Sequence, residues 1–229
     1  MTRTFWVRGL VGLCGLVVVL AVVPASFAAA LSALAWPDAF EVPGTAALNA
    51  GGDARVVSVS CAAVGECAAV GRYNDGSGTQ AFVVDETSGV WGDAVEVPGT
   101  AALNSGGDAR VVSVSCGAVG ECAAVGRYKD GSGNFHVFVV DETSGVWGDA
   151  VEVPGTAALN SGGSASVDSV SCGAVGECAA GGSYMDDLGA GHAFVVSEKS
   201  GVWGNAVEVP GTAALNTGGV AELVSVACS

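Results

Sequence analysis

The fold of this chain can be predicted from the pattern in residues 112–128, VSVSCGAVGECAAVGRY. Val and Ser alternate before Cys116, and a short loop then leads to Cys122 and an Ala/Val run. Alternation with period two is typical of a half-buried β-strand. Nearly the same wording occurs three times along the chain, so the stretch predicts a repeated hairpin.

Repetition extends beyond the cysteines. Residues 138–163 are an almost unaltered copy of residues 82–107. Tryptophans mark the unit at spacings of 55, 56 and 56 residues, at Trp36, Trp91, Trp147 and Trp203. Self-similarity at such a period indicates a solenoid, a propeller or an array built by tandem duplication.

One unit holds four strand candidates, separated by short turns and ended by Pro154, because proline cannot continue a strand ladder. These candidates are residues 110–116, 122–128, 136–142 and 146–153. The remaining residues, TAALNSGGD, are interpreted as a linker. Four short antiparallel strands, repeated, are typical of a β-propeller blade.

The predicted fold is therefore all-β and propeller-like, with three full blades and a partial one in an open arc. A string of independent β-domains is the alternative, but about 56 residues are marginal for burying a separate core. Stacked repeats bury their faces against their neighbours. The expected parts are a signal peptide over 1–30, an orphan strand and linker over 31–54, repeats over 55–109, 110–165 and 166–221, and a truncated fourth repeat over 222–229.

The first thirty residues have the parts of a secretory signal peptide. Arg3 and Arg8 precede the apolar run 10–23, and Pro24 and small residues follow it. This pattern predicts cleavage after Ala28 or Ala30. An uncleaved anchor is the alternative, because no charge occurs between Leu10 and Ala35.

Two segments resemble known families. The wording VGRYNDGSGTQAF (70–82) and GSYMDDLGAGHAFVV (182–196) is similar to the HAF-type extracellular repeats of bacteria. The SVSC…CAAVG phrase, with most of each unit, resembles the cysteine-bearing propeller repeats of secreted actinobacterial proteins. The resemblance implies an extracellular repeat fold and no defined activity.

Composition excludes one class of partner. Removal of Arg3 and Arg8 leaves six basic and 23 acidic side chains, a formal charge of −17. Phosphate binding needs clustered Lys or Arg, so nucleic acid is not an expected partner.

The cysteine spacing favours structural disulfides over metal or redox chemistry. Zinc needs four ligands per site, and a redox motif favours C-x-x-C, whereas each unit offers one C-x5-C pair. In an exported chain such pairs predict disulfides. The expected bridges are Cys61–Cys67, Cys116–Cys122 and Cys172–Cys178, and Cys228 is expected as an unpaired thiol.

Several repeated polar positions are candidates for sites. His136 and His192 occupy equivalent positions, which Gln80 takes in the first unit, and they are interpreted as strand-surface residues. The loop residues Asp75, Asp130, Asp186 and Asp187 suit turns, with calcium as the alternative. Glu66, Glu121 and Glu177 precede the second cysteine of each pair; catalytic pairing is disfavoured because the positions are copies.

The arginines and tryptophans have two interpretations each. Clustered arginines would bind a carboxylate, but a solvated role at strand ends suffices for Arg55, Arg72, Arg110 and Arg127. The four tryptophans are expected to pack between blades, with sugar contact as the alternative. The third unit departs most from the others, in 164–170 and 185–191, so a unique site is sought there.

The predicted function is that of a secreted, non-catalytic repeat protein acting as a structural, adhesive or binding module. No Ser/His/Asp set and no G-x-S-x-G motif is present. No cofactor is expected. A glycan or a protein is the expected kind of ligand, and unpaired strand edges favour self-association. The alternative is a carbohydrate-binding or glycoside-hydrolase-like propeller with a site built from loops.

Overall fold

The computed structural model describes residues 38–229, and the predicted signal peptide, the anchor alternative and Trp36 lie outside them. The chain divides into units 1–40 and 41–229, and the second contains every described helix and strand. That unit is all-β apart from four single-turn helices, as the sequence predicts.

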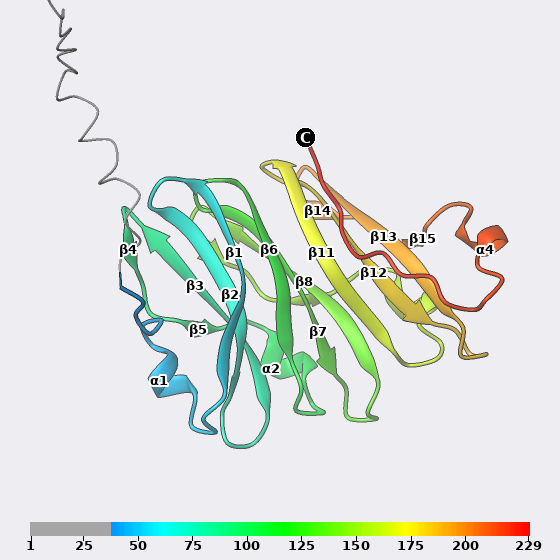
Figure 1. The fold of residues 1–229 in the computed structure, drawn as a ribbon, viewed down its shortest axis with the longest axis horizontal. Helices are drawn as coiled ribbons and strands as arrows, with labels where there is room; N and C mark the ends of the chain where they lie inside the picture. The colour runs from blue at the N-terminus through cyan, green and yellow to red at the C-terminus, as the bar shows by residue number, and fades with distance from the viewer. Residues whose placement is uncertain (1–37) are drawn as a thin grey trace, which may run out of the picture. The chain divides into compact units, whose positions relative to one another are not determined.

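Three antiparallel sheets of five strands form the unit (Figure 1). The first sheet contains β1 (Ala54–Ala63), β2 (Glu66–Asn74), β3 (Thr79–Thr87), β4 (Val90–Trp91) and β5 (Val95–Glu96). The second contains β6 (Arg110–Ala118), β7 (Glu121–Lys129), β8 (Phe135–Thr143), β9 (Val146–Trp147) and β10 (Val151–Glu152). The third contains β11 (Ala165–Ala174), β12 (Glu177–Met185), β13 (Gly191–Lys199), β14 (Val202–Trp203) and β15 (Val207–Glu208).

The predicted fourth strand of each unit is divided in two. Residues 146–153 form β9 and β10, which both pair with β8. Between them the Ala150 N–H donates to the carbonyl of Pro98, 2.8 Å away in the preceding linker, and so leaves the sheet. The single-strand prediction for this segment is wrong because this backbone bond joins one unit to the next.

The linkers are also more ordered than the sequence predicts. Each contains a helical turn, at α1 (Thr45–Leu48), α2 (Thr100–Leu103), α3 (Thr156–Leu159) and α4 (Thr212–Leu215). Gly99 precedes α2 with a φ of 79°, and a Cβ there would lie 2.8 Å from the backbone nitrogen of Ala150. Glycine is therefore required where the linker meets the next sheet.

The core lies between successive sheets. In β8, Phe138 and Val140 pack toward the first sheet, whereas Val137 and Val139 pack toward the third. All four side chains are essentially inaccessible to water. Because strand side chains alternate between faces, one strand serves two interfaces.

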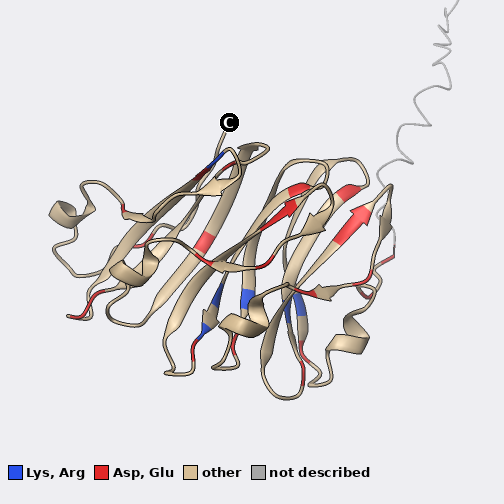
Figure 2. Ribbon diagram, turned by 180° about the vertical axis from the view of Figure 1, so that it is seen from behind, with Lys and Arg blue, Asp and Glu red and all other residues tan. Residues whose placement is uncertain are grey.

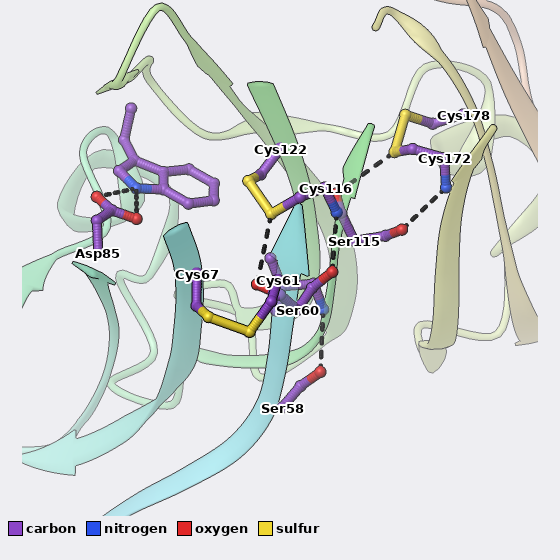
Figure 3. Close-up of a disulfide and its surroundings, with 12 residues drawn as sticks. Ser58, Ser60, Cys61, Cys67, Asp85, Ser115, Cys116, Cys122, Cys172 and Cys178 are labelled. Atoms are coloured by element: carbon purple, nitrogen blue, oxygen red, sulfur yellow. Dashed lines mark hydrogen bonds between the residues drawn. A yellow bond between two sulfur atoms is a disulfide. The ribbon is translucent and has the colours of Figure 1, made fainter. Parts of the chain in front are cut away.

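Strands β1, β6 and β11 lie side by side, one from each sheet (Figure 1). Serine hydroxyls of one strand accept hydrogen bonds from the backbone of the next. Ser60 Oγ accepts from the Cys116 N–H at 3.0 Å, and Ser115 Oγ accepts from the Cys172 N–H at 3.0 Å (Figure 3). The Val/Ser alternation thus supplies one apolar face and a row of acceptors for the next unit.

The C-terminal residues continue this row. Ser169 Oγ and Ser171 Oγ accept from the Val226 and Cys228 N–H groups at 3.2 and 3.0 Å. Ala227 occupies the position that Ser60, Ser115 and Ser171 hold in the earlier copies. Residues 222–229 therefore lie against β11 as β11 lies against β6.

The serine row gives a graded prediction. Ser60→Ala and Ser115→Ala each leave a partly buried N–H without its acceptor, so each should lower the free energy of unfolding by about 1 kcal/mol. Ser171→Ala should cost less, because Cys228 is exposed. Urea denaturation measures all three, and equal losses would contradict a role in joining the sheets.

Candidate functional site

A cavity of about 240 Å³ lies beside β1, β6 and β11 and receives residues from all three sheets. Its lining residues are Val57, Arg72, Arg110, Val111, Val112, Arg127, Ser166, Val167 and Asp168. Three guanidinium groups in one cavity are unexpected in a chain with a net charge of −15. Figure 2 shows that basic positions are sparse and gather mainly near one end of the strands.

A bulge in each of the strands β1, β6 and β11 forms part of this cavity. The pairing register shifts between Val111 and Ser113, so Val112 has no partner in β7. The same shift occurs in β1 and β11 and leaves Val57 and Asp168 unpaired. A bulge redirects the side chain of its extra residue. All three redirected side chains line the cavity, and in the third sheet the valine is replaced by aspartate.

The guanidinium of Arg127 lies in the most constrained environment. Its Cζ lies 4.6 Å from the centre of the Phe135 ring, and its Nε is buried without a hydrogen-bond partner within residues 38–229. Desolvation lowers the pKa of Arg127, and the positive charges of Arg110 and Arg72 act in the same direction. The carboxylates of Asp108 and Asp168 oppose them.

Two carboxylates offset part of this positive charge. Asp108 accepts hydrogen bonds from Arg110 and so holds that guanidinium. Desolvation raises the pKa of Asp168, Glu222 adds to the effect, and Arg127 acts against it. Three guanidinium groups thus face these two carboxylates, and Glu222 lies close enough to Asp168 to act on it.

The sequence interpretation of the arginines is therefore corrected. Arg72, Arg110 and Arg127 converge on one cavity instead of standing separately in solvent, because the sheets bring equivalent strand ends together. Arg55 alone fits the expectation: it is exposed and pairs with Asp53. The sequence signal for this cavity is the difference between residues 164–170 and the equivalent residues of the other two units, because it places Asp168 in the lining.

Two further cavities are copies of one another and lie beside the disulfides. One, of about 320 Å³, is lined by Asp85 and Glu142, and the other, of about 390 Å³, by Asp141 and Glu198. Each pairs a carboxylate of one sheet with a carboxylate of the next. The disulfides themselves, Cys61–Cys67, Cys116–Cys122 and Cys172–Cys178, close the hairpins at the predicted positions.

Tryptophan crosses each interface beside these cavities. Trp147 is 9% exposed, and its Nε1–H donates to Asp85 of the preceding sheet at 2.9 Å (Figure 3). Trp203 donates to Asp141 in the same way, at 2.9 Å. Trp91 is partly buried on the face of the first sheet that contacts neither of the other two sheets.

The interfacial glutamates are unusual acids. Glu142 and Glu198 are each 5% exposed. Desolvation raises the pKa of both to about 7, with contributions from Asp85 and Glu121 at Glu142 and from Asp141 and Glu177 at Glu198. Each carboxyl group is therefore about half protonated at neutral pH.

The repeated histidines belong to a second, outer cluster. His136 stacks on Tyr128 and lies between two carboxylates, 3.2 Å from Asp130 Oδ2 and 3.3 Å from Glu152 Oε1. The third sheet repeats it with Tyr184, His192, Asp186 and Glu208. Asp186 and then Glu208 raise the pKa of His192.

The loop aspartates organise their own turns. Asp130 Oδ1 accepts from the Ser132 and Asn134 N–H groups, and Asp75 Oδ1 accepts from Ser77 and Gly78. Over residues 38–229, no group of three or more His, Cys, Asp or Glu is arranged to hold a metal ion. Asp187 takes no part in the Asp186 turn contacts.

The glutamates before the second cysteines have a turn-capping position. Glu66, Glu121 and Glu177 accept from the N–H groups of Ser88, Ser144 and Ser200 respectively, each at 3.0 Å. Those serines have positive φ, between 52° and 53°. Cys228 is exposed and is the cysteine without a disulfide in the described part of the chain.

No protein-family model matches the chain, and no curated protein matches it.

The interfacial glutamates predict a pH dependence. Their pKa is higher in the folded than in the unfolded protein, so the stabilisation is complete below about pH 4.5 and is lost as the pH rises through about 7. Gln mimics the neutral carboxyl group. Glu142→Gln and Glu198→Gln should each raise the free energy of unfolding at pH 8 by on the order of 2 kcal/mol.

Denaturation between pH 5 and 8.5 measures this effect. Glu86→Gln is the matched control, because Glu86 occupies the same strand position on a sheet face without a preceding sheet. Its stability should change by less than about 0.5 kcal/mol. A pH profile of the Glu142→Gln protein that matches the parent profile would rule out the interfacial acid.

Proposed function

We propose that this chain is an extracytoplasmic, non-catalytic repeat module that acts by surface contact, with its sheets arranged as an open propeller-like arc. The observation that supports this best is the repeated joint between sheets. The same serine, tryptophan and linker contacts connect the first sheet to the second and the second to the third. Such a joint makes a rigid scaffold whose surfaces are free for contact.

The disulfides support the location. Three bridges within 38–229 suit an oxidising compartment. No helix in this described range is long and apolar enough to cross a membrane. The three bridges, together with the basic and apolar start of the chain, favour export to the cell envelope or beyond.

Self-association is the partner mode that the exposed face supports. Val56 and Val59 of the first sheet are 46% and 58% exposed, whereas their equivalents Val111 and Val114 are 1% and 5% exposed. In the second sheet the preceding sheet covers these positions. A second copy of the chain or a glycan on this face fits the surface-contact role.

Export and contact can be measured together. The full chain should be recovered outside the cytoplasm, cleaved after Ala28 or Ala30, with Cys228 as its one alkylatable cysteine. It should co-sediment with host cells or with insoluble polysaccharide. Retention in the cytoplasm with reduced cysteines, or recovery of the exported protein wholly in the supernatant, would contradict the proposal.

A glycoside hydrolase is the second candidate, and one observation favours it. Asp85 and Glu142 share a cavity, and a glutamate with a pKa of about 7 is suited to donate a proton at neutral pH. The cavity between the second and third sheets repeats the pair. Duplication of the arrangement at an interface favours a structural role over catalysis.

A panel of chromogenic glycosides distinguishes the two functions. We expect no product above the buffer rate. Turnover that falls at least 100-fold in the Glu142→Gln, Glu198→Gln double variant, and not in Glu96→Gln, which lines neither cavity, would establish the hydrolase instead.

A further inference from the structure

The arginine cavity concentrates half of the available positive charge. Six basic side chains lie in residues 38–229, and three of them, Arg72, Arg110 and Arg127, line this one cavity. Like charges at close range repel one another, and desolvation of Arg127 adds to that cost. An arrangement that costs folding energy and occurs once in a repetitive structure suggests a binding site.

The cavity has an unmet donor. The Nε of Arg127 is buried and has no acceptor in the described residues, although a guanidinium is an obligatory donor. Phe135 lies against the same group and restricts its orientation. Arg110, in contrast, is already bound to Asp108 by contacts of 2.6 Å and 3.1 Å. An incoming acceptor would therefore find Arg127 and Arg72 available.

Charge and geometry together restrict the ligand. A guanidinium presents parallel N–H donors that match the two oxygens of a carboxylate. The site suits a monoanion, because Asp168 stands at the cavity wall with Glu222 near it, and both would repel a second negative charge. Sulfate, a dianion, and phosphate, which is partly a dianion at neutral pH, are disfavoured on this ground.

We infer that this cavity binds the carboxylate of a small acid or of an acidic sugar, with Arg72 and Arg127 as its ligands and Asp168 as the group that selects for a single charge. The inference rests on the proposed role as a binding module and names its ligand chemistry. Arg110 and Asp108 form the fixed wall. The bulge residue Val112 provides apolar surface beside the charged groups.

The site belongs to the assembled stack. Arg72 comes from β2 of the first sheet, Arg127 from β7 of the second and Asp168 from β11 of the third. The third unit alone departs at these positions: Ser166 and Ser183 replace the arginines that the first two units share. Exact repetition would instead have added a further arginine pair and omitted the aspartate.

Titration of the disulfide-bonded protein with D-glucuronate, followed by NMR, tests the inference. Glucuronate and acetate should shift the Arg127 Nε–H resonance and the amides of residues 110–112, whereas glucose, the neutral counterpart, should not. If acetate binds as tightly as glucuronate, the carboxylate alone is recognised, which agrees with the inference. Equal shifts with glucose and glucuronate would overturn it.

Variants locate the site. Arg72→Gln and Arg127→Gln should each weaken glucuronate binding at least about 10-fold, a loss of about 1.4 kcal/mol. Arg55→Gln is the matched control, because Arg55 faces Arg72 across the β1–β2 pair and does not line the cavity. Its affinity should stay within two-fold of the parent protein. Arg72→Lys keeps the positive charge but loses the parallel N–H donors of the guanidinium, so it should bind glucuronate less tightly than the parent protein does. This variant tests the site if the Arg127→Gln protein does not fold.

Asp168→Val tests the charge selection. This change restores the residue type of the other two bulges and should allow inorganic phosphate to bind at least about 10-fold more tightly than it binds the parent. Unchanged phosphate affinity would exclude Asp168 as the selecting group. Correct export without glucuronate binding would contradict the carboxylate site and not the proposed function. Turnover of a glucuronide would contradict the non-catalytic function and would agree with a carboxylate site.

Discussion

The contact between strands β1, β6 and β11 of successive sheets holds the three sheets together. Strands β1, β6 and β11 are edge strands, and an edge strand presents N–H groups that its own sheet cannot satisfy. Here the preceding unit supplies serine hydroxyls to the exposed N–H groups of the next. The unsatisfied edge of one unit thus becomes its connection to another. This pairing accounts for the Val/Ser alternation, because N–H groups two residues apart, at Val114 and Cys116, each donate to a serine of the preceding unit.

Charged groups at the interfaces follow from the same stacking. In each interface an aspartate of one sheet accepts a hydrogen bond from a tryptophan of the next, and a glutamate lies beside it. Burial of two carboxyl groups near one another favours the protonated form of one of them. The glutamates at the joints therefore make the stability of the stacked sheets sensitive to pH.

Repetition and asymmetry have different roles in this molecule. The repeated contacts build the scaffold, while the arginine cavity exists because the copies are imperfect. Two units contribute arginines, whereas the third has Ser166 at the position of Arg110 and Asp168 at the position of the bulge residue Val112. A perfect repeat would place the same charge beside itself at each interface. Divergence at a few positions is sufficient to produce one distinct cavity.

The amino-acid sequence was sufficient to predict the repeat, the three long strands of each sheet and the position of the disulfides. Each of these follows from local information: period-two alternation, turn residues and the spacing of Cys116 and Cys122. In contrast, the tertiary structure was needed to show that the strand ends carrying Arg72 and Arg127 lie at one cavity. Arg72 and Arg127 are 55 residues apart and look like separate strand-end residues in the sequence. The stacking of the sheets and the bulges in β1, β6 and β11 bring them together, and neither can be seen in the local pattern of polar and apolar residues. The division of the fourth strand was likewise invisible, because the acceptor for the Ala150 N–H lies in another unit.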